Sequence, residues 1–555
     1  MIKERLKDLI SLSIERAREA GELKISEVPE IVLERPKEKI FGDWATNVAM
    51  VLASETKLSS LDIARTILKY LDDKQHFLTK VEVAGAGFIN FFLSNRWLYE
   101  VLKEVDALGE GYGRSNLGQG RKVQIEFVSA NPVGPMHVGH GRWAAVGDTL
   151  ANIMVATGYE VTREFYINDY GTQMNIFGKS VAVRYCQLLG RDISFPEDGY
   201  RGEYIKDIAR EIIEEEGDKY LNLSEEEREE LFRERSYVQV LEHMKKVLYD
   251  MGVEFDVWFS ESDLHRSGAV NTTVRELRKR GHVYERDGAL WLETTTFGDD
   301  KDRVLIRESG EPTYFAADIA YHKNKFERGF EKVINLWGAD HHGYVLRMKA
   351  AIKALGYPED VLEVIIGQLV NLYKGGEPVR MSKRTGEMVT LEELLQEVGR
   401  DAARYFFLTR STDSPLDFDI ELAKRQSSEN PVYYVQYAHA RICSIMDFAS
   451  EKGITPLLAS EVDLELLVHE SELDLMRKLA EFGEVVERAA LQRTPHILTR
   501  YAEDLASLFH VFYTQCRVIS GNEDLTQARL TLTRCTQIIL RNVLTLLGVS
   551  APRKM

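Results

Sequence analysis

Residues 122–167 contain the feature that most restricts what this chain can fold into. KVQIEFV (122–128) has the length and β-branched content of a buried strand, and a loop with proline and glycine follows it. HVGHGRWAAVGDTLANIMVATG (137–158) then has helical periodicity, with Gly158 placed to end the helix, and VTREFYI (161–167) is a second strand. The order strand, loop, helix, strand predicts a βαβ unit of a parallel sheet, and therefore an α/β fold. Strand-like runs at 333–337 and 364–370 extend that sheet.

The regions around this α/β core have different patterns. A chain of 555 residues is too long for one compact core, so we expect about three domains. The first, 1–114, has an α+β pattern that includes a strand-like run at 81–93. The second, 115–428, contains the α/β core and a charged helical insertion at about 175–290. The third, 429–555, is helical throughout.

Charge and cysteine content narrow the class of protein. The formal net charge of −17 disfavours nucleic acid as a partner, but much of the acid lies in the helical stretch 211–235, whereas basic residues outnumber acidic ones after 510. The four cysteines are scattered with no CxxC pair, which argues against a zinc site and fits a reducing, cytoplasmic location. No apolar run approaches 18 residues, so we expect no membrane partner.

HVGH (137–140) is a candidate nucleotide site. His137 and His140 are three residues apart on the first turn of the expected helix, so both rings project from one face. The helix N-terminus adds unpaired N–H groups and a positive dipole end, which suit a triphosphate. Gly139 lets a nucleotide approach the backbone closely. The alternatives are two histidines near a helix cap, or half of a metal site.

A basic loop, RMSKRTGE (380–387), is the second candidate. Lys383 can neutralise the charge that grows on pyrophosphate oxygens, and Ser382 can add a hydroxyl donor. The alternative is an exposed basic turn. The two segments occur in the order that a nucleotide-activating enzyme would need, which favours the functional interpretation of both.

HVGH and RMSKRTGE together resemble the HIGH and KMSKS motifs of the class I aminoacyl-tRNA synthetases. Within that class, five segments are similar to bacterial arginyl-tRNA synthetases, and the resemblance covers essentially the whole chain: QIEFVSANPVGPMHVGHGR (124–142), EPTYFAADIAYH (311–322), INLWGADHHGYVLRMKAAIKALGY (334–357), NPVYYVQYAHAR (430–441) and LGVSAP (547–552). The resemblance implies a Rossmann-type catalytic core with an inserted connective domain, an N-terminal α+β domain that contacts tRNA, and a C-terminal all-α anticodon-binding domain. One departure is Arg380, which stands at the first lysine of KMSKS and presents a planar fork instead of a point charge.

The resemblance also implies site residues. The catalytic residues are His137, His140 and Lys383, and Gly139, Met381 and Ser382 join them in binding ATP. The residues implied for arginine are Glu126, Ser129, Asn131, Tyr314, Asp318 and Asp340. The residue types agree with the chemistry, because a guanidinium needs a carboxylate that can accept two hydrogen bonds, and the Asn131 carbonyl can hold the α-ammonium group. The alternatives are a helix cap or surface carboxylate for Asp318 and a solvated strand position for Glu126.

Aromatic and arginine side chains recur in the helical C-terminal domain. Unstacked RNA bases stack on such side chains, so we expect tRNA contacts from Tyr433, Tyr437, Arg441, Tyr513 and Arg517. An ordinary buried helix stripe would account for at least half of the aromatics in this region.

By resemblance, the chain activates arginine with ATP, accompanied by Mg²⁺, and transfers it from arginyl-adenylate to the 3′-terminal adenosine of tRNA(Arg). The family's need for bound tRNA before activation implies the same dependence here. We expect a monomer in the cytoplasm without zinc. Two alternatives stay open: a small nucleotidyltransferase of the HxGH type, which would leave the helical tail unexplained, and a tRNA-binding paralogue without catalytic activity.

Overall fold

The chain forms two compact units in the computed structural model, which describes residues 2–36, 38–74, 77–379 and 389–555. One unit consists of Met1–Gly109, Ala449–Ala480 and Val511–Thr536, and the other of Glu110–Phe448, Glu481–His510 and Gln537–Met555. The helical C-terminal region is therefore shared between the units, whereas the sequence suggested a single division at 428/429.

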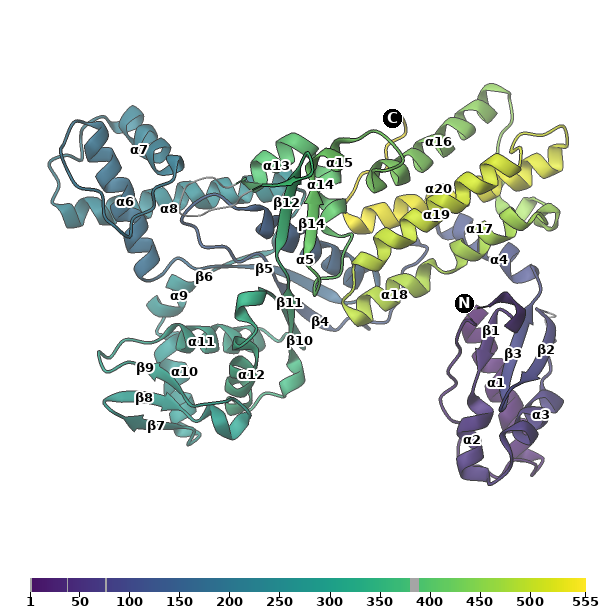
Figure 1. Cartoon of the computed structure of the whole chain (residues 1–555). Helices are drawn as coiled ribbons and strands as arrows, with labels where there is room; N and C mark the ends of the chain where they lie inside the picture. The colour runs from purple at the N-terminus through teal and green to yellow at the C-terminus, as the bar shows by residue number, and fades with distance from the viewer. Residues whose placement is uncertain (1, 37, 75–76, 380–388) are drawn as a thin grey trace. The chain divides into compact units, whose positions relative to one another are not determined.

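The first unit begins with a small α+β fold (Figure 1). Its antiparallel sheet has the order β1-β3-β2, and its helices pack around a core that includes Leu6, Ile10 and Ile67. The elements are α1 (Ile2–Glu19), β1 (Trp44–Thr46), α2 (Val48–Thr56), α3 (Ser60–Tyr70), β2 (Leu78–Ala84) and β3 (Phe88–Leu93). The single strand expected at 81–93 is instead parts of a hairpin, because Gly85 and Gly87 have positive φ and let the chain reverse between β2 and β3.

Helices supply the rest of the C-terminal region, as the sequence predicted. They are α16 (Pro431–Glu451), α17 (Glu470–Ala480), α18 (Phe482–Gln492), α19 (His496–Gln515) and α20 (Glu523–Leu547). Within the first unit, α17 packs against α4 (Arg96–Leu108), where the Tyr99 hydroxyl donates to the Leu467 carbonyl at 3.2 Å.

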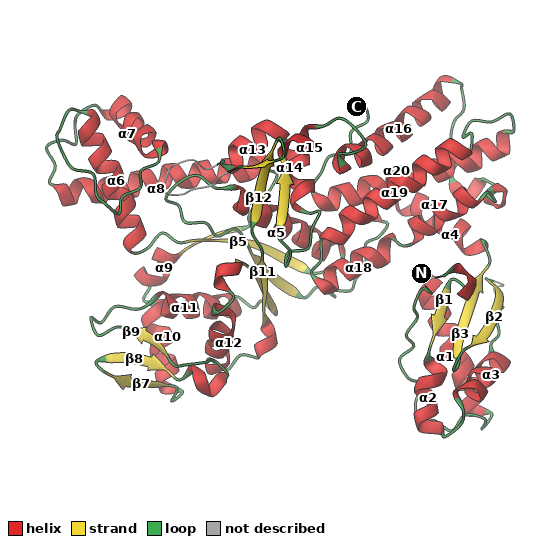
Figure 2. Ribbon diagram, in the orientation of Figure 1, coloured by secondary structure: helices red, strands yellow, loops and turns green. Residues whose placement is uncertain are grey.

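The second unit is built on a five-stranded parallel sheet with the order β11-β10-β4-β5-β6. Figure 2 draws its strands in yellow. The strands are β4 (Lys122–Glu126), β5 (Glu160–Ile167), β6 (Val257–Ser260), β10 (Lys332–Gly338) and β11 (Leu362–Gly367). The chain winds outward from β4 through β5 to β6, then crosses over to β10 and β11. The winding direction thus reverses between β4 and β10, and the carboxyl ends of these two strands form the usual ligand-binding point of such sheets.

Helix α5 (Val138–Ala156) connects β4 to β5 and packs closely on the sheet. A Cβ atom at Gly147 would lie 2.2 Å from the Phe127 ring, so only glycine allows this approach of helix to strand. The helix ends as predicted, with Gly158 at φ +84 just after the C-cap Thr157.

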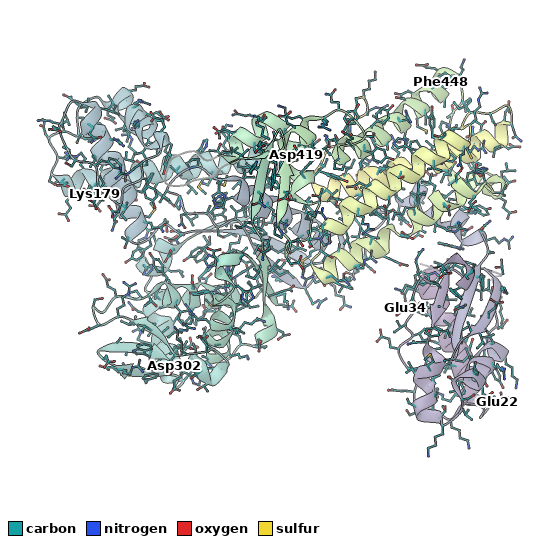
Figure 3. The ribbon with its side chains drawn as sticks, in the orientation of Figure 1. Glu22, Glu34, Lys179, Asp302, Asp419 and Phe448 are labelled. Carbon is teal, nitrogen blue, oxygen red and sulfur yellow. The ribbon has the colours of Figure 1, made fainter. Side chains whose placement is uncertain are left out.

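A group of three helices follows β5 (Figure 1): α6 (Thr172–Leu188), α7 (Glu203–Glu216) and α8 (Glu225–Asp250). Lys179 of α6 lies 3.4 Å from Glu225 and 3.3 Å from Glu229 of α8 (Figure 3). The expected insertion at about 175–290 is thus helical only in part. Strand β6 lies inside that range and returns the chain to the central sheet, and its four residues are too few to show strand periodicity in the sequence.

The second unit also contains further helices and two small sheets. These elements are α9 (Glu261–Arg266), α10 (Ala269–Lys279), β7 (Val283–Arg286), β8 (Ala289–Leu292), β9 (Arg303–Ile306), α11 (Tyr314–Glu327), α12 (Tyr344–Ala354), β12 (Val370–Lys374), β13 (Glu377–Pro378), α13 (Leu391–Val398), α14 (Arg400–Phe407), β14 (Leu416–Asp419) and α15 (Ile420–Lys424). The run expected as one strand at 364–370 divides between β11 and β12, which belong to different sheets. Cys186, Cys443, Cys516 and Cys535 are buried free thiols. No helix in the described ranges is long and apolar enough to cross a bilayer.

Candidate functional site

The HVGH segment forms the N-terminus of α5. The His137 ring caps the helix, since its Nδ1 accepts the Gly139 N–H at 3.1 Å, and His140 Nδ1 accepts the His137 N–H at 3.2 Å. The two rings stack with centroids 3.7 Å apart. Because Nδ1 is an acceptor in both rings, the neutral imidazoles carry their protons on Nε2. Each Nε2 is therefore a hydrogen-bond donor, which is what a phosphate oxygen requires.

The chain that follows the basic loop lies against this segment. Thr390 pairs with His137 in an isolated β-bridge, and the Leu391 N–H donates to the Met136 carbonyl at 2.8 Å. Thr390 also begins α13 through a capping box with Glu393. Arg380, Met381, Ser382 and Lys383 lie outside the described residues. The described residues that come directly after them are thus in contact with the start of HVGH.

Glu126 lies at the carboxyl end of β4 and is only 6% exposed, so it is not a solvated strand position. Its Oε2 lies 2.5 Å from the Nζ of Lys325, and its Oε1 accepts a hydrogen bond from Ser129 Oγ at 3.0 Å. Lys325 is fully buried on α11, seven residues after Asp318 and so on the same helix face. Sequence reasoning missed it, because a lysine in YHKNKFER has the appearance of a solvated helix position.

The backbone between Glu126 and HVGH is strained. Val128 and Ser129 are consecutive non-glycine residues with positive φ, at +69° and +42°. Such a conformation costs about 1–2 kcal/mol per residue and concentrates at functional sites. Here it turns Ser129 back toward the sheet, where Ser129 Oγ also accepts the Tyr166 N–H at 3.2 Å.

Asp318 projects from α11 and accepts a hydrogen bond from the Tyr344 hydroxyl at 2.5 Å. Burial, followed by the negative charge of Glu126, raises the pKa of Asp318 to about 7, although the Tyr344 hydrogen bond and the Lys325 charge act in the opposite direction. The carboxyl group is thus partly protonated near neutral pH in the free protein. A cation placed beside it would favour the ionised form.

A cavity of about 690 Å³ opens beside Tyr314, the first residue of α11, whose side chain is half exposed. Residues from the loop after β5 and from α9 line it together with Tyr314, among them Asp169, Glu261 and His265. Glu261 is 2% exposed, and burial, followed by the charges of Asp318 and Asp169, raises its pKa to about 8. No pattern in the sequence singled out Glu261.

Comparisons with known proteins agree with this architecture. Residues 105–422 match the family model of the class I tRNA synthetase (R) catalytic domain, 2–93 that of the arginyl-tRNA synthetase N-terminal domain, and 435–555 that of the DALR anticodon-binding domain. An arginine–tRNA ligase from Moorella thermoacetica is 53% identical over 553 residues, which are 100% of this chain and 99% of the relative. The chain belongs to the arginyl-tRNA synthetase family. An arginine–tRNA ligase from Heliobacterium modesticaldum is also 53% identical, over 558 residues, with the same coverage of both proteins.

The fold agrees as well. The arginyl-tRNA synthetase of Thermus thermophilus aligns over 100% of both chains with a TM-score of 0.76, at 23% identity. The chain is an arginine–tRNA ligase, a class I synthetase that uses ATP. These findings favour the synthetase prediction over the small nucleotidyltransferase and over the paralogue without activity.

Two predicted arginine-site residues of this synthetase lie nearer the surface. Asn131 is exposed, and its Nδ2 donates to the Gln173 Oε1 at 2.7 Å, at the start of α6. Asp340 lies on a short turn after β10, where its side chain is 81% exposed and 3.4 Å from His341 Nε2. In the described part of the chain, Asp340 does not share the buried contacts of Glu126 and Asp318. No group of three or more His, Cys, Asp or Glu side chains among the described residues could hold a metal ion.

The predicted tRNA-binding residues of this synthetase fall into both compact units. On α16, the rings of Tyr433 and Tyr437 stack 6.0 Å apart, and Arg441 Nη2 donates to the Tyr437 hydroxyl at 2.7 Å. Together with His510 they line a cavity of about 280 Å³, where burial, followed by the Arg441 charge, lowers the pKa of His510 to about 4. Tyr513 and Arg517 are exposed residues of the other unit.

Proposed function

We propose that this arginyl-tRNA synthetase binds the guanidinium of arginine between Asp318 and Glu126, at the carboxyl ends of β4 and β10. The observation that carries the proposal is the state of Asp318. Its carboxyl group is held near a second carboxylate with a pKa of about 7, and a guanidinium would supply the positive charge and the paired donors that favour ionisation. Ser129 orients Glu126.

The other arginine-site residues surround this pair. Tyr314 packs at the rim of the site, and Asn131 holds the α-ammonium group through its side-chain carbonyl. Asp340, on the exposed turn after β10, completes the site from the adenosine side. These assignments follow the resemblance of the segments that contain them.

The arginine carboxylate attacks the α-phosphorus of ATP. A new oxygen–phosphorus bond forms, the bond to the β-phosphate oxygen breaks, and pyrophosphate leaves. The Nε2 donors of His137 and His140 hold the triphosphate over the N-terminus of α5, beside Gly139. Met381 and Ser382 contact the nucleotide, and Lys383 neutralises the charge on the departing pyrophosphate. The contact of Thr390 with His137 supports the nearness of this loop to the phosphates.

Magnesium enters as the counter-ion of ATP and is therefore part of that substrate. The triphosphate oxygens are the hard ligands that Mg²⁺ prefers. Residues of the chain do the remaining work by positioning and by neutralising charge, without a covalent nucleophile.

In the second step, the 2′- or 3′-hydroxyl of the terminal adenosine of tRNA(Arg) takes the arginyl group, and AMP leaves; class I membership favours the 2′-hydroxyl. The cavity beside Tyr314 offers room for this adenosine. Anticodon bases contact Tyr433, Tyr437 and Arg441, and Tyr513 and Arg517 make further tRNA contacts.

We further propose a division of labour in which 1–114 contacts tRNA, 115–428 catalyses both steps and 429–555 binds the anticodon. The enzyme acts as a monomer in the cytoplasm. Four buried free thiols are compatible with a reducing compartment.

The substitution Asp318→Asn tests the arginine site. Removing this carboxylate leaves the guanidinium poorly paired, which costs about 2–5 kcal/mol when the pair is desolvated. We expect the arginine Kd, measured by calorimetry, to rise about 30-fold or more, with little change in the ATP Kd. The control is Asp302→Asn, which removes an aspartate that binds Tyr284 and Thr295 elsewhere in the same unit (Figure 3). An unchanged arginine Kd in Asp318→Asn would reject the assignment.

A further inference from the structure

Glu126 and Asp318 are connected by a continuous chain of hydrogen bonds that passes through Lys325. The Asp318 backbone carbonyl accepts from His322 Nδ1 at 2.8 Å. A carbonyl can only accept, so the His322 proton lies on Nδ1, and Nε2 accepts from Asn335 Nδ2 at 2.8 Å. Asn335 Oδ1 then accepts from Lys325 Nζ at 2.9 Å, and Lys325 contacts Glu126 Oε2 at 2.5 Å. Every orientation in this chain is fixed by its neighbour.

This chain of hydrogen bonds lies in the interior of the second unit. Lys325 and Asn335 are fully buried, and His322 is 2% exposed. Asn335 of β10 is also the register partner of Glu126 on β4. Burial, followed by the Lys325 charge, lowers the pKa of His322 to about 3, so its ring is neutral. Burying an ammonium group is costly unless it is paired, and here the paired carboxylate is one of the two proposed arginine ligands.

The other titratable groups near this pair are compensated or neutral, except Glu261, which is partly ionised at pH 8. Glu164 of β5 is paired with Arg328 at 2.6 Å and accepts from the Tyr321 hydroxyl at 2.6 Å. Burial raises the pKa of Tyr166, Tyr321 and Tyr344 well above its usual value. Burial raises the pKa of Glu261 on α9 to about 8. Asp169 also faces the cluster, and its carboxylate accepts hydrogen bonds from the Ser260 hydroxyl, the Ser262 N–H and the Tyr237 hydroxyl.

The charge at the arginine ligands is therefore set by three groups. Glu126 and Asp318 contribute one negative charge each when ionised, and Lys325 contributes one positive charge. We propose that Lys325 is a positioning and specificity-determining residue: it holds Glu126 ionised and oriented, and it leaves the site with a single net negative charge that matches a monocation. This inference rests on the proposed arginine site.

The role of Lys325 has a consequence for the number of protons that are released when arginine binds. In the parent enzyme, arginine displaces a proton from Asp318 only below about pH 8. In Lys325→Met, Glu126 is buried without a counter-ion and keeps its proton to higher pH, so arginine has to displace that proton as well. At the same pH, Lys325→Met should therefore release more protons per arginine bound than the parent enzyme.

The experiment is calorimetric titration of arginine at pH 8 in two buffers with different ionisation enthalpies. With the pKa of Asp318 at about 7 and that of Glu261 at about 8, the parent should release at pH 8 only the protons that these two carboxyl groups still hold, which are fewer than one per arginine bound. We expect up to one additional proton per arginine bound in Lys325→Met compared with the parent, together with an arginine Kd at least about 10-fold higher and an unchanged ATP Kd. The matched control is Lys323→Met on the same helix, which pairs with Glu276 and Glu327 and should behave like the parent. A parent-like Kd and proton count in Lys325→Met would overturn the inference.

A second pair of variants keeps the test decisive if Lys325→Met fails to fold. Glu126→Gln leaves the Lys325 ammonium unpaired beside the guanidinium, so arginine binding should weaken. Adding Lys325→Met to Glu126→Gln removes that repulsion and should restore part of the lost affinity. No restoration would overturn the role of Lys325. An unchanged arginine Kd in Glu126→Gln alone would instead overturn the proposed arginine site.

Discussion

Glu261 and Asp318 are acidic side chains that hold protons near neutral pH, and burial is the largest cause for both. A raised carboxyl pKa means that the folded chain binds a proton that the unfolded chain has already released above about pH 4–5. The free energy of unfolding therefore falls as pH rises from about 4 to 8. Near pH 8, the two buried carboxyl groups thus lower the free energy of unfolding of the ligand-free protein, which exposed carboxylates would not do.

The substitution Glu261→Gln should remove part of this instability. Glutamine resembles the protonated acid, so the free energy of unfolding should rise by about 2–4 kcal/mol at pH 8 and by much less at pH 5. Urea denaturation at the two pH values measures the difference. Glu254→Gln, an exposed position in the same unit, is the control. A gain that is equal at both pH values would contradict the assigned pKa of Glu261.

Lys383→Ala should act on the rate of activation. A donor that stabilises charge only in the transition state is worth about 10²–10³ in rate. We expect kcat for arginyl-adenylate formation to fall by that factor, with little change in the arginine Kd. Lys374→Ala is the control, because Lys374 is a lysine of β12 that pairs with Glu397. A defect confined to the KM for arginine would rule out this role.

Residue types with an evident chemical role could be predicted, and buried supporting residues could not. His137 stands at the start of a helix after a strand and a loop, which indicates a nucleotide site, and Glu126 and Asp318 were assigned through the resemblance of their segments to the family. Lys325 and Glu261 have the appearance of solvated helix residues, because their burial depends on contacts with β4 and β5 that a local pattern does not contain. A charged residue is buried only where such a partner exists.

Helix α5 combines the HVGH site with a structural ion pair. Halfway along it, Asp148 accepts from Arg404 of α14 at 2.6 Å and from Arg163 of β5 at 3.2 Å. Arg404 is fully buried and also donates to the Leu547 carbonyl at the end of α20 at 3.0 Å. A Cβ at Gly548 would lie 2.1 Å from the Arg404 guanidinium, so glycine is required there. Three elements of the second unit thus meet at one guanidinium.

Arg404→Ala should destabilise the enzyme strongly. It leaves buried carbonyls and part of the Asp148 charge without a partner, a change that costs about 3–5 kcal/mol. Urea denaturation measures the loss. Arg400→Ala, an exposed arginine on the same helix, should change the free energy of unfolding by no more than about 0.5 kcal/mol. A loss below about 1 kcal/mol in Arg404→Ala would show that the neighbouring Arg163 is sufficient for Asp148.

The elements that could be predicted were the long or strongly periodic ones. The unit formed by β4, α5 and β5 follows from its own sequence. Strand β6 does not, because four residues at a sheet edge become a strand only through pairing with β5. The same reason explains the division of 364–370 between β11 and β12.

More than half of the chain after residue 430 belongs to the same compact unit as the catalytic sheet. Within that unit, Asn542 donates to the Tyr112 carbonyl at 3.2 Å, and Gln436 donates to the Ser550 carbonyl at 2.9 Å. Deleting the chain from about 430 onward would therefore remove part of the unit that holds the active site. Loss of tRNA charging after such a deletion would not distinguish an anticodon-binding role from failure to fold. Helical periodicity could not reveal this, since it defines a helix but not the partner of its apolar face.

At the scale of the whole enzyme, arginine activation should depend on bound tRNA. The segment that contains Lys383 leads into α13 and α14, and α14 is connected to the end of α20 through Arg404 and Leu547. Thr390, which caps the start of α13, contacts His137. A ligand that shifts the C-terminal helices could thus change the population of active arrangements around HVGH.

We expect bound tRNA to affect the arginine site as well. Asp318 is partly protonated in the free protein, and it becomes a full arginine ligand only when its surroundings are complete. We expect negligible arginine-dependent exchange between ATP and pyrophosphate with RNase-treated enzyme, and ready exchange after tRNA(Arg) is added. A tRNA with an oxidised 3′ end, which cannot accept arginine, should activate equally well, because its role here is to shift the equilibrium and not to take the product. Fast exchange in the RNA-free sample would show that the site is preformed, and the coupling would then have to be abandoned while the arginine–tRNA ligase activity stands.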